Sequence, residues 1–300
     1  MSVFYSDLQW LTQNHDLLCL KQNKHDLLTP NQTWLDSVSK FDLDQFMQTQ
    51  NTHMLGTYYE ALWAFYLNHH PSTQLIAQNI QINDKQRKMN PTVGEMDFIY
   101  LDRLTQHYVH LEVAIKFYLE VNPIDPNEPL SKWMGPKKND RLDIKYHKLM
   151  DRQTKILDFA CTQATIKPLI QNKPIRAAAA LQGRLFHQFI DNADFESSFN
   201  KPNCQKHVWF TIDQFKIWFV QHHNAYNVQS IIKPHWLNLK MYSDYLKYPL
   251  LSLTQIIQKV MDHDYAQPFV VSTLQTQSIQ RMIFIAPTTW LSPLVIKENV

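Results

Sequence analysis

The sequence predicts an α/β fold in which helices flank a mixed sheet, with an N-terminal helical extension and an aromatic-rich C-terminal α+β lobe. The first observation is segment 108–119, whose side chains alternate between apolar and polar as in a half-buried strand. The second is the order of elements around it: helix, strand, strand, strand, helix, strand. The third is composition, since a chain of 300 residues with 44% hydrophobic and 19% charged residues can bury a sizeable core.

The N-terminal extension is expected to be helical over residues 7–50. Ser6 and Gln9 match a capping box ahead of a leucine-rich stretch, and a second helix is expected near 34–47. We interpret both helices as packing elements.

The helix expected at residues 55–70 is apolar or aromatic on nearly all sides, which indicates a buried helix. Its one Asp, Glu, Lys or Arg residue is Glu60, which has the small residues Gly56 and Ala64 one turn away on either side. An unpaired buried carboxylate is costly, so we expect Glu60 to have a cation, a metal ion or a proton as its partner. The alternative is a satisfied structural glutamate at the edge of the helix.

Three strands are expected next, at 74–82, 95–101 and 108–119. Gly94 opens the second strand, on which Asp97 shares a face with Glu95 and Ile99. The polar face of the third strand carries His110, Glu112, Ala114, Lys116 and Tyr118. The predicted hairpin therefore presents acidic and basic groups on its polar faces.

A basic helix is expected to start at Asn139 or Asp140 and to continue to Leu157, ahead of a strand at 176–186. Between residues 132 and 155, eight Lys or Arg stand against three Asp, which makes this the one dense positive patch of the chain. We expect its phosphate contacts to come from Lys137, Lys138, Arg141 and Lys145. The alternative is a solvated helix whose basic residues pair with aspartates at helical spacing.

The C-terminal part is rich in aromatic residues, and its strands at 268–274 and 282–285 are expected to pair as a hairpin. We place a domain boundary at the polar stretch that begins at Asp191. The expected organisation is thus 1–190 for the helical extension and the core, and 191–300 for a C-terminal lobe packed on it.

Composition excludes several classes of protein. The four glycines lie at least 38 residues apart, so GxGxxG, P-loop and GxSxG motifs are absent. The three cysteines form no CxxC or Cys/His cluster, which argues against a disulfide framework or structural zinc and favours a cytoplasmic location. No signal peptide is visible and no apolar run approaches the roughly 20 residues that span a bilayer, so we expect no membrane association. The net charge of +2 does not by itself indicate nucleic-acid binding.

Four sequence segments resemble a bacterial family of uncharacterised proteins called domain of unknown function 1853. They are GEMDFIYLD at 94–102, HLEVAIKFYL at 110–119, GPKKNDRLDIK at 135–145 and LQGRLF at 181–186. The resemblance covers most of the chain, from Asp7 to the Trp290 segment. The element order, with an acid on the second strand and an acid and a lysine on the third, also resembles the PD-(D/E)XK, or restriction-endonuclease-like, nuclease superfamily. That resemblance implies an α-β-β-β-α-β core.

The superfamily resemblance implies a metal-dependent nuclease site. Asp97 matches the metal-binding aspartate, Glu112 the acid of the third strand, Lys116 its lysine, and Glu60 the carboxylate that some members place on the first helix. The expected cofactor is Mg²⁺, or Mn²⁺ in its place, because carboxylate oxygens are its preferred protein ligands. Such an ion polarises a phosphodiester and activates water, while a lysine stabilises the charge that develops on phosphorus.

One departure from the superfamily pattern leaves two functions open. The usual acid and lysine are two residues apart, whereas Glu112 and Lys116 are four apart, roughly 13 Å along a regular strand, with Ala114 where the acid is expected. The chain is therefore either a Mg²⁺-dependent hydrolase of DNA or RNA, or an inactive relative that binds nucleic acid or protein. A third interpretation is that these charges form ordinary surface ion pairs.

Overall fold

The computed structural model describes residues 3–13, 17, 32–50, 52–84, 91–191, 207–231, 236–239, 249–274 and 280–291. The chain is a mixed α/β protein with a large mixed sheet flanked by helices. It divides into two compact units: unit 1 comprises Met1–Lys116 and Lys145–Gly183, and unit 2 comprises Phe117–Ile144 and Arg184–Val300. The boundary expected near residue 190 stays a prediction, because compactness alone does not show that a part folds independently.

The N-terminal helices of unit 1 are α1 (Val3–Thr12), α2 (Gln32–Ser37), α3 (Lys40–Gln48) and α4 (Leu55–His69). The buried helix expected at 55–70 is confirmed, since ten residues of α4 are buried, from Leu55 to Leu67. The expected capping box at Ser6 is wrong, because α1 already begins at Val3 and Ser6 is buried within it. Asp7 is also buried in α1, and it accepts a hydrogen bond of 2.5 Å from the Tyr58 hydroxyl of α4.

The strands of unit 1 are β1 (Thr73–Asn83), β2 (Thr92–Asp102), β3 (His107–Glu120) and β5 (Ile175–Gln188). β3 and β5 also extend into unit 2, which takes β3 from Phe117 and β5 from Arg184 onward. β1 and β2 are antiparallel, and so are β2 and β3, whose register runs from Phe98↔Leu111 to Asp102↔His107. The three expected strands are confirmed, because period-two alternation survives wherever one face of a strand is buried.

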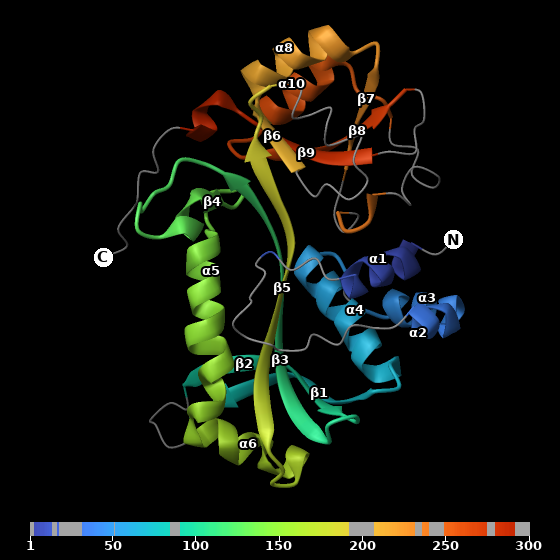
Figure 1. The fold of residues 1–300 in the computed structure, drawn as a ribbon, viewed down its shortest axis with the longest axis vertical. Coiled ribbons are helices and arrows are strands. Elements are labelled where there is room, and N and C mark those ends of the chain that lie inside the picture. The colour runs from blue at the N-terminus through green and yellow to red at the C-terminus, as the bar shows by residue number, and fades with distance from the viewer. Residues whose placement is uncertain are drawn as a thin grey trace. The chain divides into compact units, whose positions relative to one another are not determined.

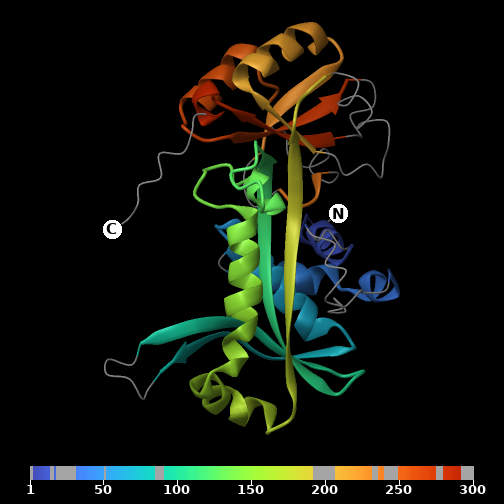
Figure 2. The ribbon, with the colours of Figure 1, turned by 60° about the vertical axis from the view of Figure 1, so that its left-hand side comes forward.

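Helices lie on both sides of the long strands of unit 1. Figures 1 and 2 show α4 on one side of β3 and β5, and the helical segment that continues from Lys145 on the other. This segment belongs to α5 (Leu142–Lys148), passes through a π-helical turn (Leu149–Gln153) and a 3-10 turn (Thr154–Asp158), and precedes α6 (Ala160–Ile170). A buried cluster joins these turns and α6 to the sheet: Ile82, Met96, Ile99, Tyr108, Ile156, Ile166 and Ile170.

Gly183 brings β5 against β3. Its φ of +150° is a conformation that side chains rarely allow, and a Cβ there would lie 1.7 Å from the carbonyl oxygen of Lys116. The close approach of the two backbones at this point therefore requires glycine.

Unit 2 contains β4 (Trp133–Met134), β6 (His207–Thr211), β7 (Tyr226–Ser230), β8 (Gln267–Thr273), β9 (Gln280–Ala286), α8 (Ile212–His222) and α10 (Leu253–Met261). β6 pairs in parallel with β9 and with the C-terminal end of β5. β8 pairs antiparallel with β7 and with β9. The hairpin expected at 268–274 and 282–285 is confirmed as β8 and β9. α8 and α10 begin with capping boxes at Thr211 and Ser252.

The basic helix begins two to three residues later than expected, at Leu142. The preceding residues form a tight loop, in which the Gly135 amide donates to the Asp140 carbonyl at 2.8 Å and the Lys138 amide donates to the Gly135 carbonyl at 2.8 Å. Lys138 adopts a positive φ of 59°, which a helix cannot accommodate. Among the described residues, no helix has both the length and the apolar character needed to cross a membrane.

Candidate active site

Asp97 lies just past the end of the described ladder between β2 and β3. The last described pair on this side is Phe98↔Leu111, and beyond it the Asp97 carboxylate, not a backbone carbonyl, accepts the Val113 amide at 2.8 Å. The Asp97 carboxylate thus takes the place of a backbone carbonyl of β2 as the acceptor for the Val113 amide. This interaction holds Asp97 beside the segment of β3 that carries Glu112.

Glu112 is fully buried, and both of its carboxylate oxygens have partners within unit 1. His110 Nε2 lies 2.7 Å from Oε1, and Gln153 Nε2 donates to Oε2 at 2.5 Å. His110 is also fully buried, and its Nδ1 finds no hydrogen-bond partner among the described residues. Two neighbours therefore determine the orientation of the Glu112 carboxylate.

Asp97, Glu112 and Glu60 act on one another electrostatically. Burial raises the pKa of Asp97 to about 7, the charge of Glu112 adds to the rise, the Val113 amide opposes it, and Glu60 contributes further. Burial, followed by the charges of Glu95 and Glu112, raises the pKa of Glu60. Carboxylates such as Asp97 and Glu60, whose pKa values are raised by burial and by neighbouring negative charge, are typical of a site that holds a proton or a cation.

Lys145 supplies a positive charge to this group from the helical side. Its Nζ donates to Gln153 Oε1 at 3.2 Å. Burial lowers the pKa of Lys145, the charges of Lys116 and Lys148 lower it further, and Asp97 and Glu112 oppose the change. Gln153 therefore links the ammonium group of Lys145 to the carboxylate of Glu112.

Lys116 is partly buried on β3, at the point where Gly183 packs against the strand backbone. Its charge acts on Lys145, so both lysines belong to the same electrostatic environment. Within unit 1, Asp97 thus interacts electrostatically with Glu60, Glu112 and Lys145, and Lys116 acts on Lys145.

The donor chemistry fits a hard divalent cation. Mg²⁺ is usually held by one or two carboxylates, with water and substrate phosphate as its other ligands. Asp97 and Glu112 provide such carboxylates, and a bound cation would oppose both the burial and the charge of Glu112, which raise the pKa of Asp97. No group of three or more His, Cys, Asp or Glu side chains that could hold a metal ion is found in the described part of the chain.

The other residues expected to contact nucleic acid lie in unit 2 and pack on neighbouring side chains. Lys137 Nζ lies 4.9 Å from the centre of the Tyr265 ring, and Lys138 Nζ lies 5.7 Å from that of Trp290. Arg141 forms two hydrogen bonds with the Asp143 carboxylate, at 2.8 and 2.5 Å. These contacts hold the three cations at determined positions, and their role toward nucleic acid stays a prediction.

Sequence reasoning missed His110 and Gln153. For His110 a signal existed, because it lies two residues before Glu112 on the same strand face. For Gln153 no local signal existed, because its role depends on the packing of a helical segment 41 residues away from Glu112.

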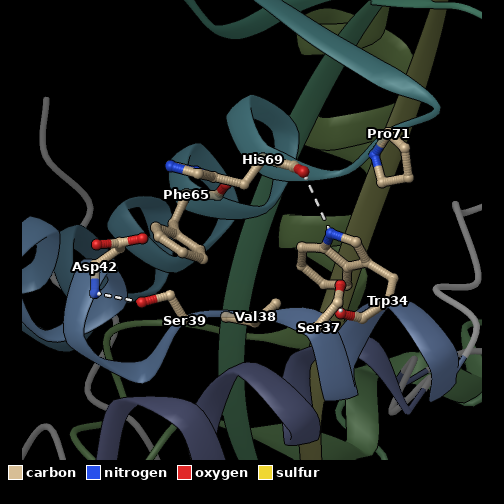
Figure 3. Close-up of a pocket in the computed structure, with 8 residues that line it drawn as sticks. All are labelled: Trp34, Ser37, Val38, Ser39, Asp42, Phe65, His69 and Pro71. Atoms are coloured by element: carbon tan, nitrogen blue, oxygen red, sulfur yellow. Dashed lines mark hydrogen bonds between the residues drawn. The ribbon is translucent and has the colours of Figure 1, made fainter.

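A separate pocket of about 380 Å³ lies among the helices of unit 1 (Figure 3). Its walls include Trp34, Phe65 and His69, and Trp34 Nε1 donates to the His69 carbonyl at 3.2 Å. Asp42 and Ser39 form part of its polar edge, and the Asp42 amide donates to the Ser39 hydroxyl oxygen at 3.2 Å (Figure 3). None of the expected site residues lines this pocket.

Comparison with known families gives one match over most of the chain. The model of the family described as Domain of unknown function (DUF1853) matches residues 6–285. No curated protein matches the chain significantly, and neither does any solved structure.

Proposed function

The chain belongs to the DUF1853 family, and we propose that it is a metal-dependent phosphodiesterase of the PD-(D/E)XK type that hydrolyses DNA or RNA. The observation that carries the proposal is the carboxylate pair at the end of the β2–β3 ladder. Asp97 and Glu112 repel each other there beside the ammonium group of Lys145. Acidic and basic groups in this combination are what hydrolysis of a phosphodiester requires.

Each side chain has a defined role in this proposal. Asp97 and Glu112 hold Mg²⁺ or Mn²⁺, with Glu60 as a further carboxylate nearby. The ion, when bound, polarises the phosphodiester and lowers the pKa of a bound water. His110 and Gln153 keep the Glu112 carboxylate in one orientation, and the lysines stabilise the negative charge that develops on phosphorus.

Nucleic acid is the proposed substrate class because eight Lys or Arg stand against three Asp between residues 132 and 155. Lys137, Lys138, Arg141 and Lys145 are each proposed to contact the phosphate backbone of the nucleic acid. Such contacts release counterions, so the affinity for nucleic acid is expected to fall steeply with salt.

The test is turnover by the purified chain with Mg²⁺ or Mn²⁺ on four substrates: supercoiled plasmid, linear duplex DNA, single-stranded DNA and structured RNA. Asp97→Ala and Glu112→Ala should each abolish cleavage. Asp151→Asn is a matched control, because Asp151 is an exposed carboxylate that pairs with His147 and Lys155. Cleavage that survives in both site variants would refute the proposed site, and failure to cut any substrate would refute the activity.

A second candidate function is an inactive nuclease-fold protein that binds nucleic acid or protein. The specific observation that favours it is that Glu112 is fully buried with each oxygen already hydrogen-bonded by the protein. In that case binding should be sensitive to salt and unaccompanied by turnover, and Asp97→Ala should leave the affinity unchanged.

A further inference from the structure

The Lys145–Gln153–Glu112 chain of hydrogen bonds suggests which lysine serves the site. The sequence pattern assigns that role to Lys116, on the same strand as Glu112 and four residues further along. β3 is one strand from His107 to Glu120, so the two Cα atoms are about 13 Å apart along it. A lysine that reaches the carboxylates from another element avoids this separation.

Gln153 connects Lys145 to Glu112 in an orientation that chemistry determines. Its amide oxygen accepts from the Lys145 ammonium at 3.2 Å, and its amide nitrogen donates to the Glu112 carboxylate at 2.5 Å. The flipped amide would place its NH₂ group against an ammonium and its oxygen against a carboxylate, which neither partner can bond. Gln153 therefore ties the cation to the acid in one arrangement.

The π-helical turn explains how residues eight apart can meet on one face. On a regular α-helix, residues eight apart are offset by about 80° around the helix axis. The π-helical turn at Leu149–Gln153 adds about one residue to that path, which reduces the offset between Lys145 and Gln153. Single π turns in helices are frequent at functional sites.

We propose that Lys145 is the catalytic lysine, which contacts the scissile phosphate, and that Gln153 is the residue that positions it. This inference rests on the proposed phosphodiesterase function. Lys116 then acts on the site through its charge and not by contact with substrate.

The experiment compares three lysine variants of the full chain: Lys145→Met, Lys116→Met and Lys148→Met. Lys148 is the matched control, because it is an exposed lysine three residues further along α5. Lys145→Met should lower kcat by about 100-fold or more, the usual effect of removing one transition-state contact. Lys148→Met should stay within about fivefold of the wild type, and Lys116→Met should lower kcat less than Lys145→Met does, because Lys116 acts on the site only through its charge. Lys145→Arg, which keeps the charge, should recover part of kcat and guards against misfolding of the Met variant.

The positioning role of Gln153 has its own readout. Gln153→Leu should lower kcat in the wild type and much less in the Lys145→Met background, with KM and circular dichroism unchanged, because positioning of Lys145 matters only while the ammonium group is present. If Gln153→Leu lowered kcat/KM only by raising KM, with kcat unchanged, the positioning role of Gln153 would be refuted.

Binding measurements separate failure of this inference from failure of the proposed function. Calorimetric titration with Mn²⁺, then with inorganic phosphate, should show that Lys145→Met keeps or gains Mn²⁺ affinity and loses phosphate affinity. If Lys145→Met has the kcat of the wild type while Asp97→Ala is inactive, the proposed role of Lys145 is refuted and the proposed phosphodiesterase activity is not. If the wild type cleaves none of the substrates, the proposed function is refuted. If Lys145→Met also binds inorganic phosphate as tightly as the wild type does, the contact between Lys145 and phosphate is refuted as well.

Discussion

Replacing Asp97 with Asn should stabilise the protein at alkaline pH. Burial and the charges of Glu112 and Glu60 raise the pKa of Asp97 to about 7, against an ordinary value of 3.8. Asn has the same shape and keeps an oxygen that can accept the Val113 amide, but it carries no charge. The variant therefore removes the repulsion and retains the hydrogen bond.

The magnitude follows from the difference between the folded and unfolded pKa values of Asp97. The folded value is higher, so the folded protein holds an extra proton between about pH 4 and pH 7. The stability that this proton provides is fully present below about pH 4 and is lost progressively as the pH rises from about 4 to about 7. Three pKa units correspond to about 4 kcal/mol, which is the upper limit of the gain expected for Asp97→Asn at pH 8.

The assay is urea unfolding of the wild type and Asp97→Asn at pH 6 and pH 8, without divalent cations. The advantage of the variant should grow between these two pH values, while Asp151→Asn, which alters an exposed carboxylate, should change little at either. Addition of Mg²⁺ at pH 8 should narrow the gap, because a cation between the carboxylates relieves the same repulsion. If Asp97→Asn is no more stable than the wild type at pH 8, the carboxylates do not repel each other as described, and the argument for a cation site fails.

Four other substitutions test the packing and the basic surface. Gly183→Ala should lower the free energy of unfolding, measured by thermal unfolding, by about 3 kcal/mol or more, because the new Cβ would overlap the β3 backbone. Gly56→Ala is the control, and it should raise stability by up to about 1 kcal/mol, because its Cβ would meet nothing within 4 Å. Equal effects of the two substitutions would contradict the close approach of β5 to β3. Tyr58→Phe should cost about 2 kcal/mol in urea unfolding, since it removes the hydroxyl donor to the buried carboxylate of Asp7; an unchanged midpoint would show that this hydrogen bond contributes little. Lys137→Gln should reduce the slope of log affinity for nucleic acid against log salt by about one; an unchanged slope would exclude a phosphate contact by this lysine.

Local patterns were sufficient for the strands and for the buried helix. The alternation in β3 and the apolar circumference of α4 both arise from residues close in sequence, so they could be interpreted without knowing what covers them. Local patterns failed at helix starts. Ser6 resembles a cap but lies inside α1, and Asn139 and Asp140 resemble caps but belong to a loop closed by backbone hydrogen bonds.

The amino-acid sequence by itself determined the family, the order of the elements and the residue types proposed for the site. Those features depend on local spacing, and Asp97 and Glu112 stand out because each is a charged residue on the polar face of a strand. Only the tertiary structure decided how the charges interact. Lys145, which the sequence places in a basic patch, is joined to Glu112 through Gln153, because strand pairing and a π turn bring together residues 41 positions apart. Electrostatic coupling acts through space, so it depends on long-range packing that no local pattern contains.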